Sequence, residues 1–377
     1  MSNTPLKVLQ LRASGSMLGA ENVVLEIANY SKEFDVECII GIPLLETDEV
    51  PEFAVKSEKA GIAVKQFKYR STFDLNLSRS IKKYVEENDI DLIHCHGYQE
   101  DFYALLAKTG KPLVATNHLW KRTTTKLKIY AQIDSFIMRY FKKIVAVSKP
   151  IFDEVSTLGY GKKSSIIANG VNVPRFTQVV PSETKNNLRQ EFNLNDDTVV
   201  VGMVSSLTRE KDHETALKSF KKHLDAGNSN TKLLIIGHGD ERENLDQLVK
   251  ELNLSQHVTF AGQRSDILEL LSIMDIYLLS SLKEGLPISL LEAMASKLPV
   301  ICSDVGDICQ VINDGVNGYL VNSEDTDTFA EKISLLANDK TLREKIAIQS
   351  QQTIIDHYSA QNMSKNYCLL YKEVLSK

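Results

Sequence analysis

The sequence has little of what an integral membrane protein or a nucleic-acid-binding protein needs. No run of about 18 apolar residues occurs, so no segment is typical of a membrane-spanning helix. The first residues, MSNTPLKVLQLR, lack the basic start, apolar core and small-residue cleavage site of a signal peptide. Positive charge is not in excess, because 44 Lys and Arg residues stand against 49 Asp and Glu residues for a net charge of −5. We therefore expect a cytoplasmic protein without nucleic-acid partners.

Cysteines are few, odd in number and scattered. No pair has C-x-x-C spacing, so the sequence predicts neither a disulfide framework nor a thiolate metal site. Most of them fall in apolar runs and are expected to be buried free thiols. The five are Cys38, Cys95, Cys302, Cys309 and Cys368.

Metal-ligand patterns are weak. His94 and His96 form an H-x-H pair at a predicted strand end, but we expect their side chains to point to opposite faces of the sheet, and no carboxylate completes a site. Two D-x-D sequences, at 89–91 and 325–327, have a spacing by which carboxylates can hold a metal. The first precedes a strand and the second opens a helix, where acidic residues favour the helix dipole. We therefore predict no metal site.

Strands and helices alternate along the chain in two series. A length of 377 residues suits about two domains. Short apolar runs alternate with helical segments from Lys7 to Ser148 and again from Val199 to Val321, with a polar linker at 177–197. This alternation is typical of an α/β fold with doubly wound parallel sheets, which bind ligands beyond the carboxyl ends of their strands.

The second series is organised around Met274–Asp304, MDIYLLSSLKEGLPISLLEAMASKLPVICSD, which predicts strand, loop, helix, loop and strand. Glu284 lies in the first loop, and Glu292 lies about a turn and a half inside the helix. Helix side chains lean toward the N-terminus, so both carboxylates can face one ligand. Between them, free N–H groups near Gly285 and Leu286 and the helix dipole favour an anion. The pattern predicts a ligand with phosphate in its middle and hydroxyls at both ends, such as a nucleotide-sugar.

The segment EGLPISLLEA resembles the E-x7-E signature of the retaining glycosyltransferases of family 4 (GT4, glycosyl transferases group 1). That family has the GT-B fold, in which two Rossmann-like domains with doubly wound parallel sheets face each other across a cleft. The resemblance covers nearly the whole chain. It implies an acceptor-side domain at 1–178, a nucleotide-sugar domain at 179–356, and a helix at 357–377 that packs back on the first domain.

Motifs of the first half extend the resemblance. The loop ASGSMLGAEN is similar to a GT4 loop that often ends in GGAE, and it supplies Gly15 and Gly19 as donor-binding residues, although Leu18 replaces one glycine. A loop that only turns the chain is the alternative. ATNH resembles the T-x-H at the end of a GT4 strand, which implies that His118 faces the transferred sugar.

Motifs of the second half concern the donor. SSLTREKD resembles the GT4 loop G-R-L-x-x-x-K, whose arginine and lysine hold the diphosphate. Lys211 matches the lysine, Ser206 stands in place of the arginine, and Arg209 is the candidate substitute. By the same analogy the backbone beside Arg264 would meet the base, although Arg264 itself can equally be a surface charge.

The resemblance implies a hexosyltransferase that moves a sugar from a nucleoside-diphosphate donor to a saccharide or lipid-linked acceptor, with retained configuration and without metal or cofactor. A UDP-sugar is favoured over a GDP-sugar, and surface polysaccharide assembly is the expected setting. Glu292 would accept the ribose hydroxyls, Glu284 a sugar hydroxyl, and Lys211 with Gly285 and Leu286 would stabilise the leaving diphosphate. His118 and Glu284 are thus the expected catalytic residues. No side chain reads as a nucleophile, so the leaving phosphate would take the acceptor's proton.

Two functions of other classes stay open. One is a sugar-nucleotide 2-epimerase on the same fold, which would release altered nucleotide-sugar. The other is a non-catalytic nucleotide-sugar-binding module, which the serine at position 206 favours slightly.

The segment Lys121–Lys143, KRTTTKLKIYAQIDSFIMRYFKK, is basic and has apolar residues at helical spacing. Such a helix can lie at the inner face of a membrane with anionic lipid. We favour a surface helix that packs its apolar stripe, Ile129, Ile133, Phe136 and Tyr140, on the sheet.

Overall fold

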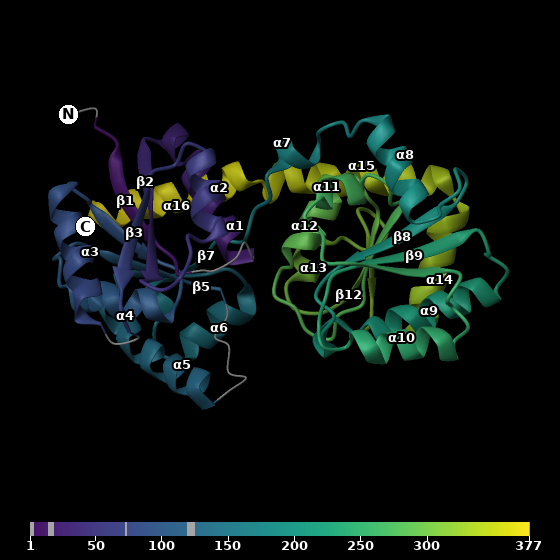
Figure 1. Cartoon of the computed structure of the whole chain (residues 1–377), viewed down its shortest axis with the longest axis horizontal. Helices are drawn as coiled ribbons and strands as arrows, with labels where there is room; N and C mark the ends of the chain where they lie inside the picture. The colour runs from purple at the N-terminus through teal and green to yellow at the C-terminus, as the bar shows by residue number, and fades with distance from the viewer. Residues whose placement is uncertain (1–3, 14–18, 72–73, 119–124, 377) are drawn as a thin grey trace. The chain divides into compact units, whose positions relative to one another are not determined.

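The computed structural model describes residues 4–13, 19–71, 74–118 and 125–376. The chain divides into two compact units (Figure 1). Unit 1 comprises Met1–Gly170 and Ala360–Lys377, and unit 2 comprises Val171–Ser359. Each unit has its own parallel sheet and its own hydrophobic core.

Unit 1 is built on a seven-stranded sheet in the order β3-β2-β1-β4-β5-β6-β7, with every pair parallel. The order reverses beside β1, as in doubly wound folds. The central strands are almost wholly buried, which is why they read as continuous apolar runs and not as alternating ones. The strands are β1 (Leu6–Leu11), β2 (Val36–Leu45), β3 (Val64–Tyr69), β4 (Leu92–Cys95), β5 (Leu113–Asn117), β6 (Lys143–Ala146) and β7 (Ser164–Ile166).

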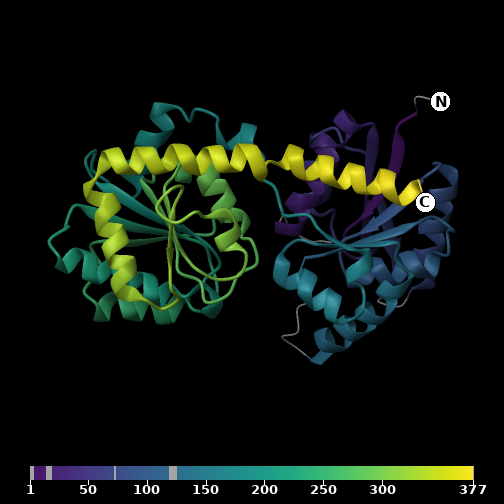
Figure 2. The same cartoon turned by 180° about the vertical axis from the view of Figure 1, so that it is seen from behind.

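Helices connect these strands, and the last helix of the chain completes the unit. They are α1 (Gly19–Ser31), α2 (Glu52–Lys59), α3 (Leu75–Glu87), α4 (Tyr98–Ala107), α5 (Thr125–Ile137), α6 (Lys149–Thr157) and α16 (Ala360–Leu375). Helix α16, yellow in Figure 2, packs against α1, far away in sequence. Ser364 Oγ donates to the carbonyl of Ile27 at 2.8 Å. Tyr367 and Tyr371 of α16 are fully buried, so this helix is part of the unit 1 core.

Unit 2 repeats the design with a six-stranded parallel sheet in the order β10-β9-β8-β11-β12-β13. Its strands are β8 (Val199–Val204), β9 (Thr231–Ile236), β10 (Val258–Gly262), β11 (Ile276–Leu279), β12 (Val300–Ser303) and β13 (Tyr319–Val321). Its helices are α7 (Val173–Phe176), α8 (Ser182–Glu191), α9 (His213–Asp225), α10 (Arg242–Glu251), α11 (Ile267–Leu271), α12 (Ile288–Ala295), α13 (Ile308–Val311), α14 (Thr326–Asn338) and α15 (Lys340–His357). The strand–loop–helix–strand stretch predicted at 274–304 corresponds to β11, α12 and β12.

The unit boundary differs from the predicted one between residues 178 and 179. Unit 2 already begins at Val171, whose N–H donates to Tyr358 O at 2.9 Å, and α7 packs against α12. These contacts tie the start of the polar linker to unit 2. At the other end the helix predicted at 357–377 begins at Ala360, and the residues up to Ser359 belong to unit 2.

Candidate active site

Two loops of unit 2 that are distant in sequence are joined by one ion pair. Lys211 Nζ lies 2.5 Å from Glu284 Oε1, and Ser281 Oγ donates to the same carboxylate oxygen at 2.7 Å. Ser280 Oγ donates to Asp212 O at 2.7 Å. The short helical turn at 209–211 and the loop after β11 therefore form one polar structure at the carboxyl end of the sheet. The sequence reasoning missed the two serines; a serine pair directly after a buried strand was the signal for them.

The loop before α12 leaves backbone donors available. Asp307 N donates to Gly285 O at 3.1 Å, which fixes this peptide, and Gly306 packs against it with a φ of +61°. A Cβ atom on Gly306 would lie 2.1 Å from Glu284 O, so only glycine fits. Within the described residues, the N–H groups of Gly285 and Leu286 have no hydrogen-bond partner. Together with the α12 dipole they can hold an anion.

Glu292 lies on α12 behind this helix start. Burial raises its pKa to about 7, while the positive charge of Arg175 on α7 acts in the opposite direction. The described part of the chain offers its carboxyl no hydrogen-bond donor. When a carboxyl group is partly buried and receives no hydrogen bonds, its charged carboxylate form is destabilised. A ligand that supplies hydroxyl donors would relieve that cost.

The two predicted donor-binding arginines lie elsewhere. Arg209 is exposed and lines a separate hollow with Glu214, Glu241 and other residues. Arg264 is bound at 2.6 Å by Glu191 of α8 and at 2.7 Å by Asp266, which raises its pKa further. These partners correspond to the alternative of a surface charge, because a ligand would have to compete with two carboxylates.

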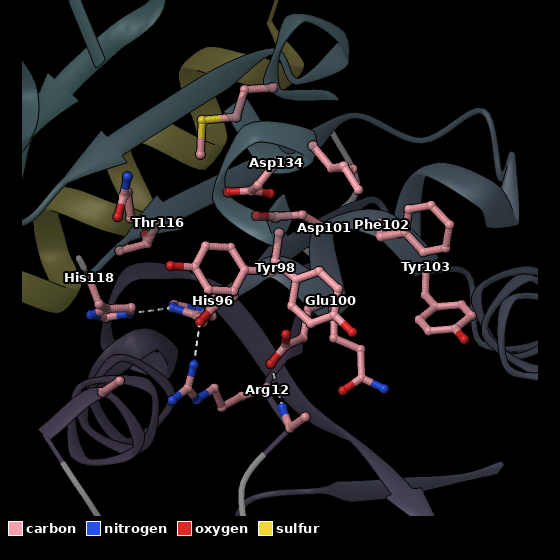
Figure 3. Close-up of a pocket in the computed structure, with 18 of the residues that line it drawn as sticks. Arg12, His96, Tyr98, Glu100, Asp101, Phe102, Tyr103, Thr116, His118 and Asp134 are labelled. Atoms are coloured by element: carbon pink, nitrogen blue, oxygen red, sulfur yellow. Dashed lines mark hydrogen bonds between the residues drawn. The ribbon is translucent and has the colours of Figure 1, made fainter. Parts of the chain in front are cut away.

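Unit 1 contains a cavity of about 580 Å³ beyond the carboxyl ends of β4 and β5 (Figure 3). Its walls mix aromatic rings with carboxyl, amide and imidazole groups. This mixture suits a sugar, whose C–H faces pack on rings while its hydroxyls form hydrogen bonds. Among the residues that line it are Arg12, Gly19, Glu21, His96, Tyr98, Glu100, Asp101, Phe102, Tyr103, Asn117, His118, Tyr130, Ile133 and Asp134.

His118 lines this cavity as an uncharged imidazole. Its Nε2 lies 3.2 Å from His96 Nδ1, the contact drawn as a dashed line in Figure 3. Burial, and then the charge of Arg12, lower the pKa of His118 to about 3. Arg12 itself is held by Glu21 at 2.7 Å and donates to His96 O at 2.5 Å. An imidazole held in this uncharged form can take part in hydrogen bonds but offers no positive charge.

Three buried carboxyl groups, those of Glu100, Asp101 and Asp134, also line the cavity. Glu100 Oε1 accepts from Ala13 N at 2.5 Å, and burial raises the pKa of Glu100. Burial and the neighbouring Asp134 raise the pKa of Asp101 well above its usual range. Asp101 Oδ1 and Asn117 Nδ2 are buried and have no hydrogen-bond partner among the described residues. Sequence reasoning missed all four side chains. Glu100 and Asp101, at the start of α4, read equally well as helix-dipole partners.

The expected orientation of the H-x-H pair is wrong. The rings of His94 and His96 lie 4.0 Å apart, because residues two apart on a strand share a face of the sheet. His94 instead bonds to Tyr371 and Thr116, both at 2.7 Å. In the described ranges no group of three or more His, Cys, Asp or Glu side chains could hold a metal ion.

Two further predictions concern segments beside the cavity. Gly15 lies outside the described residues, whereas Gly19 begins α1 and lines the cavity. The stripe on α5 was expected to pack on the sheet, and this is wrong. Ile129, Ile133, Phe136 and Tyr140 are 45–58% exposed. The buried face of the helix is instead the one that carries Ala131, Asp134, Ile137 and Met138. No helix in the described part is long and apolar enough to span a membrane.

Comparison with known proteins places both halves in known families. The model of Glycosyltransferase Family 4 matches residues 18–175, and that of Glycosyl transferases group 1 matches residues 184–353. EpsD of Bacillus subtilis (strain 168), named as a glycosyltransferase, is 26% identical over 313 residues, which cover 78% of this chain and 81% of EpsD. N-acetyl-alpha-D-glucosaminyl L-malate synthase of Bacillus anthracis is 26% identical over 310 residues, 80% of each chain.

A third relative is the UDP-Gal:alpha-D-GlcNAc-diphosphoundecaprenol alpha-1,3-galactosyltransferase of Escherichia coli. It is 26% identical over 283 residues, 71% of this chain and 72% of that protein. Among solved structures, HepE of Anabaena in complex with UDP has a TM-score of 0.83 at 20% identity, covering 98% of this chain and 100% of HepE.

The fold of the two units is therefore GT-B, as the resemblance implied. The two family models match the two halves in their expected order, and the E-x7-E glutamates and Lys211 lie within the second match. The chain belongs to the glycosyltransferases of family 4 and group 1, and it is a glycosyltransferase.

Proposed function

We propose that the chain is a retaining, metal-independent hexosyltransferase that uses a nucleoside-diphosphate sugar, with a UDP-sugar favoured, in the assembly of a surface polysaccharide or glycolipid. The carrying observation is the pairing of Lys211 with Glu284 beside the available N–H groups of Gly285 and Leu286. An ammonium group and a helix start can neutralise a departing diphosphate. A relative named for a UDP-galactose donor and a structural neighbour bound to UDP support the choice of base.

The residues of unit 2 divide the donor between them. Lys211 donates one N–H to Glu284, which leaves two for phosphate oxygens. Glu292 accepts the ribose hydroxyls, and this interaction supplies the donors that its partly buried carboxyl lacks. Glu284 accepts a hydroxyl of the transferred sugar.

The acceptor belongs in the unit 1 cavity. Its aromatic walls and the unpartnered Asp101 Oδ1 and Asn117 Nδ2 suit the hydroxyls of a saccharide. In the reaction an acceptor oxygen bonds to the anomeric carbon while the bond from that carbon to the phosphate oxygen breaks. The acceptor's proton passes to the leaving phosphate, whose oxygen gains an electron pair as its bond to the anomeric carbon breaks.

We further propose that the protein works at the inner face of a membrane, with α5 lying on anionic lipid. The exposed stripe at 129–140 is flanked by the exposed cations Lys128, Arg139 and Lys142. Arg139 lies 3.7 Å over the ring of Phe136, so charge and apolar surface share one face. An amphipathic basic helix of this kind binds lipid surfaces. Relatives with diphosphoundecaprenol acceptors suit this setting.

A thermal-shift screen tests the donor. Wild type and Glu292→Ala are heated with UDP, GDP, ADP and their sugars in the presence of EDTA. A nucleotide at 100 times its Kd should stabilise unit 2 by about 2.7 kcal/mol, a shift of several degrees. A shift with UDP that Glu292→Ala abolishes supports the proposal. Absence of any shift in a folded protein supports the alternative of a module that binds another ligand, and release of altered nucleotide-sugar without an acceptor supports the epimerase.

A further inference from the structure

A chain of hydrogen bonds runs through the interior of unit 1 and ends at His118. Gln10 Nε2 donates to Cys38 Sγ at 3.0 Å, and Gln10 Oε1 lies 3.0 Å from His96 Nε2. His96 Nδ1 lies 3.2 Å from His118 Nε2. Gln10, Cys38 and His96 are almost completely buried, so water does not compete for these bonds. This chain of hydrogen bonds joins β1, β2 and β4 to the end of β5.

The direction of each bond follows from counting protons. The Gln10 amide donates through its nitrogen to Cys38, so the oxygen that it turns to His96 can only accept. His96 Nε2 must then carry a proton. A neutral imidazole has one N–H, so His96 Nδ1 is an acceptor, and His118 Nε2 must carry the proton between the two rings.

Both rings are held uncharged by their surroundings. His96 is buried beside His94 and His118, and the Arg12 guanidinium donates to its carbonyl at 2.5 Å. Burial and these neighbours lower the pKa of His96 well below its usual range and that of His118 to about 3. With its proton on Nε2, neutral His118 has a bare lone pair on Nδ1.

We propose that Gln10 and His96 are positioning residues that keep His118 in the Nε2-protonated tautomer, so that its Nδ1 accepts a hydrogen bond from a hydroxyl of the sugar substrate. This inference rests on the proposed function and on the expectation, implied by the family resemblance, that His118 faces the transferred sugar. The site then recognises a hydroxyl donor at this position and disfavours a group that can only accept, such as a carboxylate or a phosphate.

Nitrogen-15 NMR of the full-length protein labelled at histidine tests the tautomer without any substrate. The expected spectrum at pH 7 shows His96 and His118 both neutral and protonated on Nε2. A proton on Nδ1 of His118, or an imidazolium at this pH, overturns the inference. Because the readout is independent of turnover, an inactive or non-transferring protein leaves the tautomer result valid and counts only against the proposed function.

Variants then connect the tautomer to catalysis. Gln10→Leu removes the acceptor for His96, so His118 should populate both tautomers, and kcat with a UDP-sugar should fall roughly tenfold, the size of one hydrogen bond. Cys38→Ala frees the Gln10 amide and should act in the same direction, whereas Cys38→Ser keeps an acceptor and should restore the wild-type spectrum. If Gln10→Leu fails to fold, the comparison of Cys38→Ala with Cys38→Ser still tests the inference.

His94→Asn is the matched control. His94 is as buried as His96 and adjoins it, but its bonds go to Tyr371 and Thr116 and not to the chain. It should lower stability and leave the tautomer of His118 unchanged. If His94→Asn, Cys38→Ser and Cys38→Ala all lost activity equally and all kept the wild-type tautomer of His118, the chain of hydrogen bonds would be only structural.

Discussion

The Lys211 ammonium and the Glu284 carboxylate form an ion pair of 2.5 Å across 73 residues of sequence. Their side chains are 21% and 8% exposed, so solvent screens this pair less than a surface pair. Lys211→Met should weaken UDP binding about 10- to 100-fold, because a charge-assisted contact to phosphate is lost. Uridine, which has no phosphate, should bind equally to both proteins. Isothermal titration calorimetry measures both.

The control for this charge loss is Lys221→Met on α9. Lys221 also forms an ion pair within its own unit, with Asp225, but both side chains lie on the helix surface. UDP affinity should stay within twofold of wild type. Similar weakening in the two variants would mean that overall charge, and not the Lys211 contact, governs binding.

Glu292 should make stability and ligand binding depend on pH. Its folded-state pKa of about 7 lies above the ordinary value of 4.5, so the native state binds the proton more tightly than the unfolded state. Its contribution to stability is therefore fully present below about pH 4.5 and is lost as pH rises to about 7. UDP affinity should rise over pH 6–8, because ribose hydroxyls favour the carboxylate.

Glu292→Gln keeps the shape of the side chain and removes the titration. Urea unfolding at several pH values should show a smaller loss of stability between pH 4.5 and 7 than in wild type. The pH dependence of UDP binding should flatten in parallel. An unchanged pH profile of both quantities in the glutamine variant would place the titrating group elsewhere.

Gly306 should be one of the most sensitive positions of unit 2. A Cβ atom there meets Glu284 O at 2.1 Å in a backbone with a φ of +61°, so Gly306→Ala should cost about 3 kcal/mol. Gly315 has a similar φ of +73° but open space around it, and Gly315→Ala should cost only about 1 kcal/mol. Chemical denaturation of both variants measures the difference. Equal losses would show that backbone strain alone, and not contact with the Glu284 loop, requires glycine at 306.

The α5 surface should bind anionic vesicles. Ile129→Ser combined with Phe136→Ser should reduce co-sedimentation with phosphatidylglycerol vesicles at least tenfold, because two inserted side chains contribute about 1.5–3 kcal/mol each. Ile348→Ser removes an isoleucine that is as exposed as Ile129, at 50%, but lies on α15. This control should bind like wild type. Equal binding by all three proteins, or absence of vesicle binding in wild type, would refute the membrane contact.

Much of the fold was predictable because it is local. Buried parallel strands are continuous apolar runs, so the alternation of strands and helices in both halves and the strand–loop–helix–loop–strand order at 274–304 were readable from the sequence. Strand β7 was missed because its residues are only partly buried, and its sequence therefore lacks an apolar run. The boundary at 178 was misplaced because the polar linker gives no sign that Val171 pairs with Tyr358.

The candidate site was predictable only in part. The glutamates at 284 and 292 stood out by their spacing from helix and strand ends, and Lys211 stood out because its loop resembles a GT4 loop. The roles of all three remain predictions. The sequence did not distinguish whether Arg264 contacts a ligand or is a surface charge, because its ion-pair partner Glu191 is 73 residues away. The stripe on α5 was assigned to the core by its periodicity. Periodicity shows that residues share a face, but it does not say whether that face meets the sheet or the solvent.

Local sequence patterns were enough to predict two α/β halves and the strand–loop–helix frame of Glu284 and Glu292, and sequence motifs indicated the family. Each of these depends on neighbours within a few turns of the chain. Long-range folding is needed to bring Lys211 to Glu284, to place carboxyls of α4 and α5 in one cavity, and to join Cys38 and Gln10 to His118 through His96. These relationships join strands that lie side by side in a sheet although tens of residues separate them, and no local pattern encodes which buried polar groups will satisfy one another.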